Sequence, residues 1–120
     1  MDKIRFEIAT KVMSLEVFQA TEMGYEELID YADKDPKYDL FYWGRDYKGE
    51  GFLRLPYYTH NMSDAWQVVE RVTQPPTNGE FRVNDTFAYW FARAELYFLT
   101  EQEAATAICS KVLELLNAQL

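Results

Sequence analysis

The residues best suited to bind a ligand lie between positions 37 and 60, where aromatic and basic side chains are interspersed. This segment holds eight of the chain's 20 aromatic residues, and four basic and three acidic residues give it a net charge of +1. Aromatic rings beside Arg and Lys are what proteins use to stack a nucleobase and to hold its phosphate. We therefore predict a nucleotide site formed by Trp43, Arg45, Arg54, Tyr58 and His60. The alternative is a β-hairpin whose rings pack inward and whose charges are solvated.

Other reactive side chains are few. His60 is the only histidine, so a triad or an acid–base pair built on histidine would have to use it. No Gly-x-Ser-x-Gly or similar nucleophile motif accompanies it, which favours a loop histidine that bonds backbone groups. Cys109 is the only cysteine, and its apolar, small-residue surroundings favour a buried packing thiol over a nucleophile. A small hydrolase built on His60 is the minor alternative to a protein without catalytic residues.

Metal sites and cofactors are not predicted either. Transition-metal sites need clusters of Cys and His, and one residue of each type cannot make one. Asp and Glu are abundant, but they do not occur at the spacing of a calcium loop. The sequence thus predicts a non-enzymatic protein with no metal and no cofactor.

The charge and the hydropathy pattern restrict the partners further. With a net charge of −8, general nucleic-acid binding is not expected, because neutralising phosphates requires a basic face. No apolar run approaches the roughly 18 residues of a membrane span. Residues 1–7 lack the long apolar region of a signal peptide, and one cysteine cannot form an internal disulfide. We therefore expect a cytoplasmic protein, and its 120 residues predict a single domain over 1–120.

Tyr58 and His60 of the predicted nucleotide site precede a helix predicted at 62–73, which must position them. Asn61 is suited to cap it, and Asp64 lies in its first turn, where the helix dipole favours negative charge. The double proline at 75–76 ends it. Trp66 is predicted to be its main buried anchor, because an indole carries a large apolar area. The apolar stripe comprises Met62, Ala65, Trp66, Val69 and Val72.

Two further helices are predicted at the ends of the chain. Residues 3–14 carry an apolar stripe of Ile4, Ile8, Val12 and Leu15, with Ala9 beside it. At the other end, Thr100 and Glu103 form a capping box, in which the hydroxyl takes one amide and the carboxylate reaches back for another. The apolar face that follows comprises Ala105, Ile108, Val112, Leu115 and Leu116.

The remaining segments are predicted as follows. Residues 22–33 favour a short helix, and 37–55 favour a hairpin with an aromatic strand at 40–43 and a turn over 44–51. Residues 80–83 favour a strand. Residues 84–100 fit either a helical stripe or a hairpin, because short apolar runs cannot be settled by periodicity.

Segment 56–70 contains Pro-x-Tyr at 56–58 and Ala-Trp-x-Val-Val-Glu at 65–70. This pattern resembles the signature of the phage αβα-sandwich domain family, small proteins of phages and prophages of Gram-positive bacteria. Thr59, His60 and Asn61 stand where the signature has a Ser, a Thr and an Asp cap. Residues 9–13 resemble the family's first helix, which ends in Val-Met-Gly, but Ser14 replaces the glycine. Residues 107–109 resemble its C-terminal Ala-Ile-Cys helix. The residues that match the signature are Pro56, Tyr58, Ala65, Trp66, Val68, Val69 and Glu70.

This resemblance implies an α+β fold, a small antiparallel sheet layered between helices in an αβα sandwich. Because the family has strands before its last helix, the resemblance favours strands at 87–92 and 95–99. It also implies a phage protein acting in the cytoplasm of a bacterial host.

Two classes of function follow from the resemblance and from the missing catalytic motifs. The leading hypothesis is a binding protein that antagonises host anti-phage defence, either by sequestering a nucleotide-derived immune signal or by binding a defence protein. The alternative is an interaction subunit of a phage replication or regulatory assembly without a defence role. The number of aromatics predicts a homo-oligomer in either case, because exposed apolar patches usually mean contacts.

Overall fold

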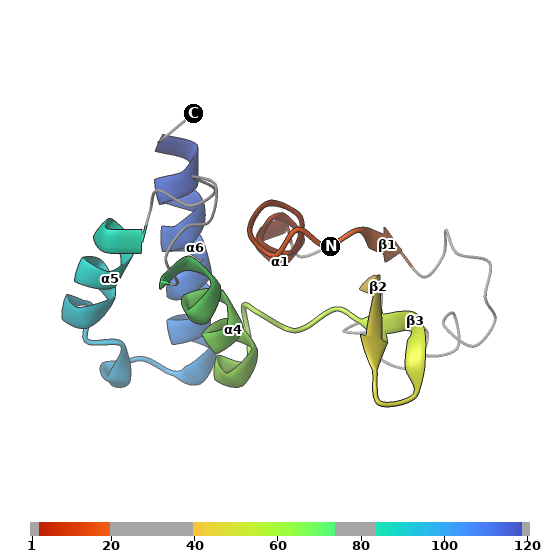
Figure 1. Ribbon diagram of the computed structural model, residues 1–120. Coiled ribbons are helices and arrows are strands. Elements are labelled where there is room, and N and C mark those ends of the chain that lie inside the picture. Colours follow the sequence, from red (N-terminus) through yellow and green to blue (C-terminus); the bar gives the residue numbers. More distant parts are fainter. Residues whose placement is uncertain (1–2, 20–39, 74–83, 119–120) are drawn as a thin grey trace. The chain divides into compact units, whose positions relative to one another are not determined.

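The computed structural model describes residues 3–19, 40–73 and 84–118 (Figure 1). The chain divides into two compact units, one made of residues 1–8 and 57–120 and the other of residues 9–56. The predicted helix at 22–33 and the predicted strand at 80–83 lie outside the described residues. The single domain over 1–120 stays a prediction.

The first unit is helical. The three longer helices are α4 (Met62–Thr73), α5 (Asn84–Arg93) and α6 (Glu101–Ala118), and a 3-10 turn, η3 (Leu96–Phe98), joins the last two. These helices pack against one another, and the short α1 (Lys3–Glu7) contacts α6 (Figure 1).

Helix α4 has the predicted bounds and the predicted cap. The Asn61 Oδ1 accepts the backbone N–H of Ser63 at 2.9 Å and that of Asp64 at 3.4 Å. Trp66, however, is 46% exposed and contacts the Phe91 ring edge-on at 5.9 Å, so the prediction of a buried anchor is wrong. The reason is that the buried stripe is centred about one residue away from it, on Ala65, Val68, Val69 and Val72.

Residues 84–93 form an α-helix and residues 96–98 a 3-10 turn, so the strands predicted at 87–92 and 95–99 are wrong and the helical alternative is correct for most of the segment. Phe87 is buried and its ring stacks on that of Phe91, one helical turn away, at 5.9 Å. Glu95 has a left-handed backbone, with φ 53°, and separates α5 from η3. The aromatic residues are placed by packing against α4 and α6, which overrides their intrinsic preference for strands.

Helix α6 begins with the predicted pair of Thr100 and Glu103. The Glu103 N–H donates to the Thr100 hydroxyl at 3.2 Å, but the Glu103 carboxylate accepts that hydroxyl at 2.8 Å instead of a backbone amide. Of the predicted face, Ala105, Ile108 and Val112 are buried. Cys109 is also buried, and its thiol donates to the carbonyl of Tyr58 at 3.3 Å, which confirms a packing role.

The predicted N-terminal helix at 3–14 is shorter and partly of another type. Helix α1 continues as a turn of π-helix, η1 (Ile8–Val12), in which Ile8, Ala9 and Val12 are buried as expected. The helix ends at Val12, and in the turn that follows Ser14 has φ 56° and the Leu15 N–H donates to the Ala9 carbonyl at 2.9 Å.

The second unit contains an antiparallel sheet in the order β1 (Val17–Gln19), β2 (Leu40–Asp46), β3 (Gly49–Arg54). The predicted hairpin is confirmed, but its turn is only two residues long, because Asp46 pairs with Gly49. Gly49 has φ 118°, and Asp46 Oδ1 accepts the Lys48 N–H at 2.8 Å. Strand β1 was not predicted.

An antiparallel sheet together with helices confirms the predicted α+β class. Among residues 3–19, 40–73 and 84–118, no helix is long and apolar enough to span a membrane.

Candidate functional site

Three of the five predicted site residues lie on one face of the β2–β3 hairpin. In the observed register Trp43 pairs with Phe52, Arg45 with Glu50, and Phe41 with Arg54. Directly paired residues share a face of a sheet, and so do residues two apart on one strand. Trp43, Arg45 and Arg54 therefore project from the same side, and we call them the hairpin face.

Aromatic contacts fix the indole at the centre of the hairpin face. The Trp43 ring meets the Phe52 ring edge to face at 5.0 Å, and Phe52 makes a second edge contact of 5.4 Å with Phe18 of β1. Trp43 nevertheless stays 51% exposed. The row of rings thus holds an indole in place while leaving about half of it to solvent.

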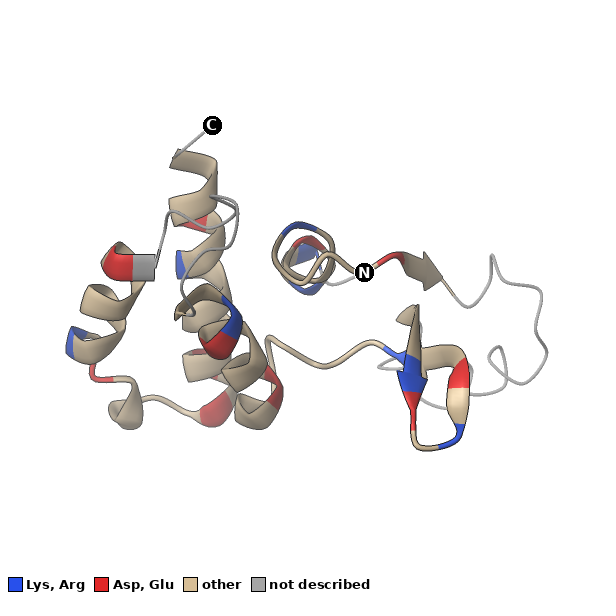
Figure 2. Cartoon of the chain, in the orientation of Figure 1, with Lys and Arg blue, Asp and Glu red and all other residues tan. Residues whose placement is uncertain are grey.

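The two arginines flank this indole. Arg45 is two residues along β2, and Arg54 is a diagonal neighbour across the strands, a position about 7–8 Å away. The Arg45 guanidinium pairs with Glu50 at 3.0 Å, with both side chains largely in solvent. An exposed pair of this kind contributes only about 0–1 kcal/mol, so a phosphate can compete with Glu50 for Arg45. Figure 2 shows both signs of charge along β2 and β3.

The opposite face of the hairpin is occupied by Tyr42. A Cβ placed on Gly44 would lie 2.6 Å from the Tyr42 ring, so that ring covers the glycine. Burial, and next the carboxylate of Asp46, raise the pKa of the Tyr42 phenol above its ordinary value. This opposite face therefore carries the Tyr42 phenol and the Asp46 carboxylate, whereas both arginines lie on the hairpin face.

The other two predicted site residues, Tyr58 and His60, belong to the helical unit. Tyr58 is only 1% exposed, so its ring is part of the core and presents no face for a base to stack on. His60 is half-buried. Its Nδ1 lies 2.9 Å from the Thr59 hydroxyl, and the centre of its ring lies 4.4 Å from that of Tyr57. The backbone N–H of His60 donates to the Tyr57 carbonyl at 3.1 Å.

His60 thus lies in a loop, as predicted, and the hydrogen bond that its ring makes with Thr59 joins a side-chain hydroxyl, where the prediction was a bond to backbone groups. The Arg5 guanidinium lies 4.5 Å from the centre of the Tyr57 ring, on the residue that His60 also contacts. Arg5 is itself buried. Sequence reasoning missed this cluster, since nothing in the spacing of residue 5 and residues 57–60 links them.

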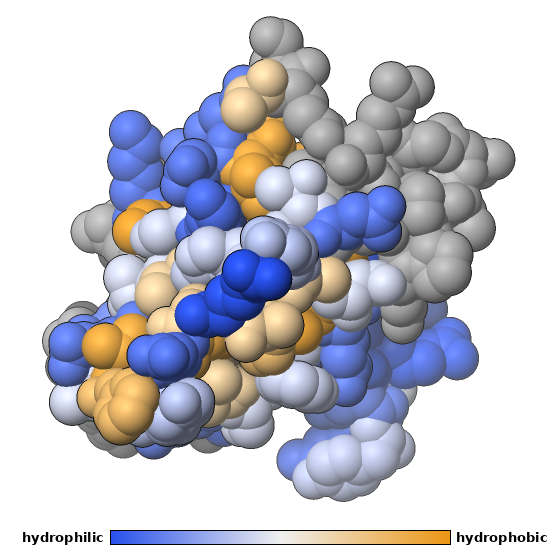
Figure 3. Space-filling model, turned by 90° about the vertical axis from the view of Figure 1, so that its left-hand side faces the viewer, coloured by the Kyte–Doolittle hydropathy of each residue, from blue (hydrophilic) through white to orange (hydrophobic). Residues whose placement is uncertain are grey.

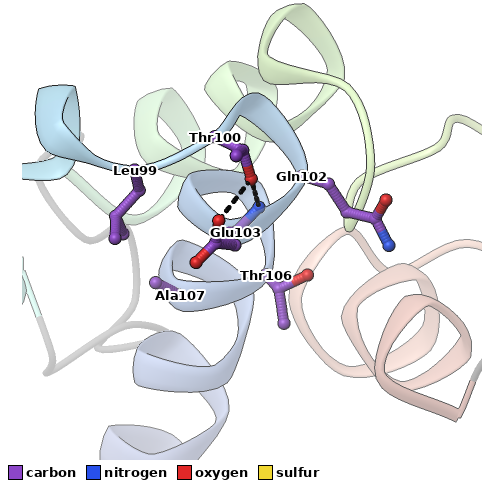
Figure 4. Close-up of a pocket in the computed structure, with 6 residues that line it drawn as sticks. All are labelled: Leu99, Thr100, Gln102, Glu103, Thr106 and Ala107. Atoms are coloured by element: carbon purple, nitrogen blue, oxygen red, sulfur yellow. Dashed lines mark hydrogen bonds between the residues drawn. The ribbon is translucent and has the colours of Figure 1, made fainter.

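A shallow hollow of about 480 Å³ lies over the first turns of α6 (Figure 4). We call it the α6 hollow. The Thr100 hydroxyl and Glu103 bond each other within it, and the Thr106 hydroxyl donates to the Thr59 carbonyl at 2.9 Å. It contains a carboxylate and no basic side chain, so it does not suit an anionic ligand. Its lining residues are Leu99, Thr100, Gln102, Glu103, Thr106 and Ala107.

Sequence reasoning also missed Phe52 and Glu50 as parts of the hairpin face. Their roles depend on register, and the register follows from the position of the two-residue turn. A sequence signal was present, since Gly49 stands three residues after Asp46, but the glycines at 44 and 51 suggested a wider turn.

Comparison with known proteins agrees with the resemblance in residues 56–70. The family model for the phage ABA sandwich domain matches residues 7–110. No curated protein and no solved structure matches the chain. Because the match covers most of the sequence, including both units, the chain belongs to the phage ABA sandwich domain family.

Proposed function

We propose that this protein is a non-enzymatic binding protein with which a phage antagonises host defence, and that its hairpin face sequesters a nucleotide-derived immune signal. The observation that carries the proposal is the shared face of Trp43, Arg45 and Arg54 on β2 and β3. Membership of a phage family supports the setting, a phage protein in the host cytoplasm.

The chemistry of the hairpin face suits a nucleotide better than a nucleic-acid strand. A base stacked on the exposed part of Trp43 contributes about 1–3 kcal/mol. Two guanidinium groups at either side of the indole provide bidentate donors for phosphate oxygens. A longer polyanion would extend past the two arginines and meet the Glu50 carboxylate on the same face, and the net charge of −8 would repel each of its phosphates.

Calorimetric titration of the purified protein against cyclic nucleotides and ADP-ribose derivatives tests the binding. We expect Trp43→Ala to weaken binding about 10- to 100-fold, the factor that corresponds to the loss of one stacked base. Arg54→Gln should also weaken it, while Tyr58→Phe should leave it unchanged because Tyr58 is buried. Tyr47→Ala is the matched control, since Tyr47 is an exposed ring in the turn of the same hairpin.

Growth of a gene-deleted phage on defended and undefended hosts tests the biological role. Loss of growth only on defended hosts is the expected result. Equal loss on both would favour a subunit of a phage replication or regulatory assembly. If no nucleotide binds and a defence protein co-purifies, sequestration is the wrong mechanism.

A further inference from the structure

A second surface of the molecule, separate from the hairpin face, has the composition of a protein-binding site. The rings of Tyr97 and Phe98 are 78% and 74% exposed and lie 4.4 Å apart on η3. Leu99 follows them, is also exposed, and lines the α6 hollow. We call Tyr97, Phe98 and Leu99 the η3 patch. Figure 3, seen from the side of α5 and η3, shows apolar residues reaching the surface between hydrophilic ones.

The charge around the η3 patch is mainly negative, although Arg93 ends the helix that precedes it. Residues 95–107 include Glu95, Glu101 and Glu103 and no Lys or Arg. Figure 2 shows these acidic positions on the connection before η3 and on the first turn of α6. The α6 hollow beside the patch combines aliphatic carbons of Leu99 and Ala107 with the Glu103 carboxylate. That combination fits a side chain with an apolar stem and a cationic head.

The neighbouring helix already holds a contact of this type. The Arg93 guanidinium lies 4.2 Å from the centre of the exposed Tyr89 ring, at the end of α5. Tyr97 and Phe98 offer similar ring faces, with carboxylates nearby to pair with the charge.

We propose that the η3 patch and the α6 hollow form the docking surface for a protein partner that presents Arg or Lys beside an apolar side chain. The partner's cation lies on the carboxylates and its apolar side chain covers Tyr97 and Phe98. Aromatic residues and Arg dominate the energetics of such interfaces. This inference does not depend on the nucleotide proposal, since it uses different residues in a different unit.

Charge disfavours the competing occupants. A second copy meeting the patch across a two-fold axis would bring three carboxylates of each chain together, and Arg93 of each chain would offset their repulsion only in part. A phosphate-bearing ligand or an anionic membrane would meet the same carboxylates. A cationic protein surface gains from each of them and is also attracted by the net charge of −8.

The test uses the full chain and three synthetic helical peptides. The first carries a leucine face flanked by arginines, the second has Glu at the arginine positions, and the third has Ser at the leucine positions. Fluorescence anisotropy gives the affinities, and amide chemical shifts locate the contact. We expect the first peptide to bind at least tenfold more tightly than either other peptide, with shift changes within residues 95–107.

Variants then separate this surface from the rest of the protein. Phe98→Ser and Glu95→Gln should each weaken binding of the arginine–leucine peptide several-fold, and both replace exposed side chains, so circular dichroism should be unchanged. Tyr47→Ser is the control and should bind normally. Absent binding, binding that ignores the peptide's charge, or equal binding by Phe98→Ser would overturn the proposal. So would a wild-type dimer that Phe98→Ser converts to a monomer, because the patch would then bind a second copy.

Discussion

Ser14 occupies a backbone conformation that residues with a side chain disfavour. Its φ of 56° places it in the left-handed region, two residues after the helix that ends at Val12. The Leu15 N–H reaches back to the Ala9 carbonyl, so the turn closes the helix much as a glycine-ended helix closes. The resemblance to the family's Val-Met-Gly ending has a physical meaning at this position: only glycine adopts this conformation without a Cβ penalty.

Ser14→Gly should therefore stabilise the protein, by about 0.5–1 kcal/mol, because relief of the Cβ penalty exceeds the added entropy of the unfolded chain. Urea unfolding measures this as a higher midpoint with an unchanged slope. Ser110→Gly is the control, since Ser110 lies exposed within α6 and its replacement should destabilise by roughly 0.5–1 kcal/mol. Should Ser14→Gly prove no more stable than Ser14→Ala, the left-handed backbone is not a source of strain.

At the scale of elements, α4 is held at its start by side chains from two sources. Asn61 accepts the N–H groups of Ser63 and Asp64, and the Glu101 carboxylate of α6 accepts the N–H of Met62 at 3.0 Å. Asp64 in turn accepts the Tyr57 N–H at 2.8 Å, which fixes the loop that carries His60. These bonds satisfy amides that a helix cannot pair internally and join α4 to α6.

Asn61→Ala removes the shared acceptor and should lower the free energy of unfolding by about 1 kcal/mol, the usual effect of losing an N-cap. Asn61→Asp keeps an oxygen in place and should lose little or nothing, which separates the hydrogen bonds from the change in size. Thermal unfolding of both variants at neutral pH makes the comparison. Equal stability of Asn61→Ala and the wild type would show that water replaces the cap without penalty.

Elements whose signals are local could be predicted from the sequence. Helix α4 followed from its cap, its stripe and the prolines after it, and α6 followed from Thr100 and Glu103. The hairpin followed from its aromatic strand and glycines. Strand β1 could not be predicted, because three residues show no periodicity and its partner Leu40–Tyr42 lies more than 20 residues away. For helix α5 the local pattern allowed a helix as well as strands, and the strands that the family resemblance favoured are wrong because packing on α4 and α6 places these rings.

The residues of the candidate site likewise differ in whether a local signal or tertiary packing determines their role. Trp43, Arg45 and Arg54 were predicted from residue type, and their common face follows from strand pairing once the turn is located. Tyr58 was chosen by type as well, but its burial depends on tertiary packing, which sequence alone does not give. The η3 patch was missed for the opposite reason, since Tyr97 and Phe98 had been assigned to a strand and are exposed instead.

At the scale of the whole molecule, the net charge of −8 opposes the approach of a ligand to the hairpin face and favours the approach of a ligand to the η3 patch. The hairpin face attracts phosphate only locally, through Arg45 and Arg54, whereas the field of the whole chain repels an approaching anion. For the η3 patch, the local carboxylates and the distant charge both attract a cation. The two proposals therefore differ in how binding rates respond to salt.

Stopped-flow mixing at low and near-physiological ionic strength measures this difference. The screening length falls from about 30 Å at 0.01 M to about 8 Å at 0.15 M, so salt removes the field of the distant charges and leaves close contacts largely intact. The association rate constant of the arginine–leucine peptide should fall steeply with salt, because long-range attraction speeds its encounter. That of the nucleotide should stay constant or rise, because screening removes a repulsion. A steep fall for both ligands would mean that the guanidinium groups of the hairpin face outweigh the net charge, and a flat response for the peptide would mean that the carboxylates near η3 do not steer it.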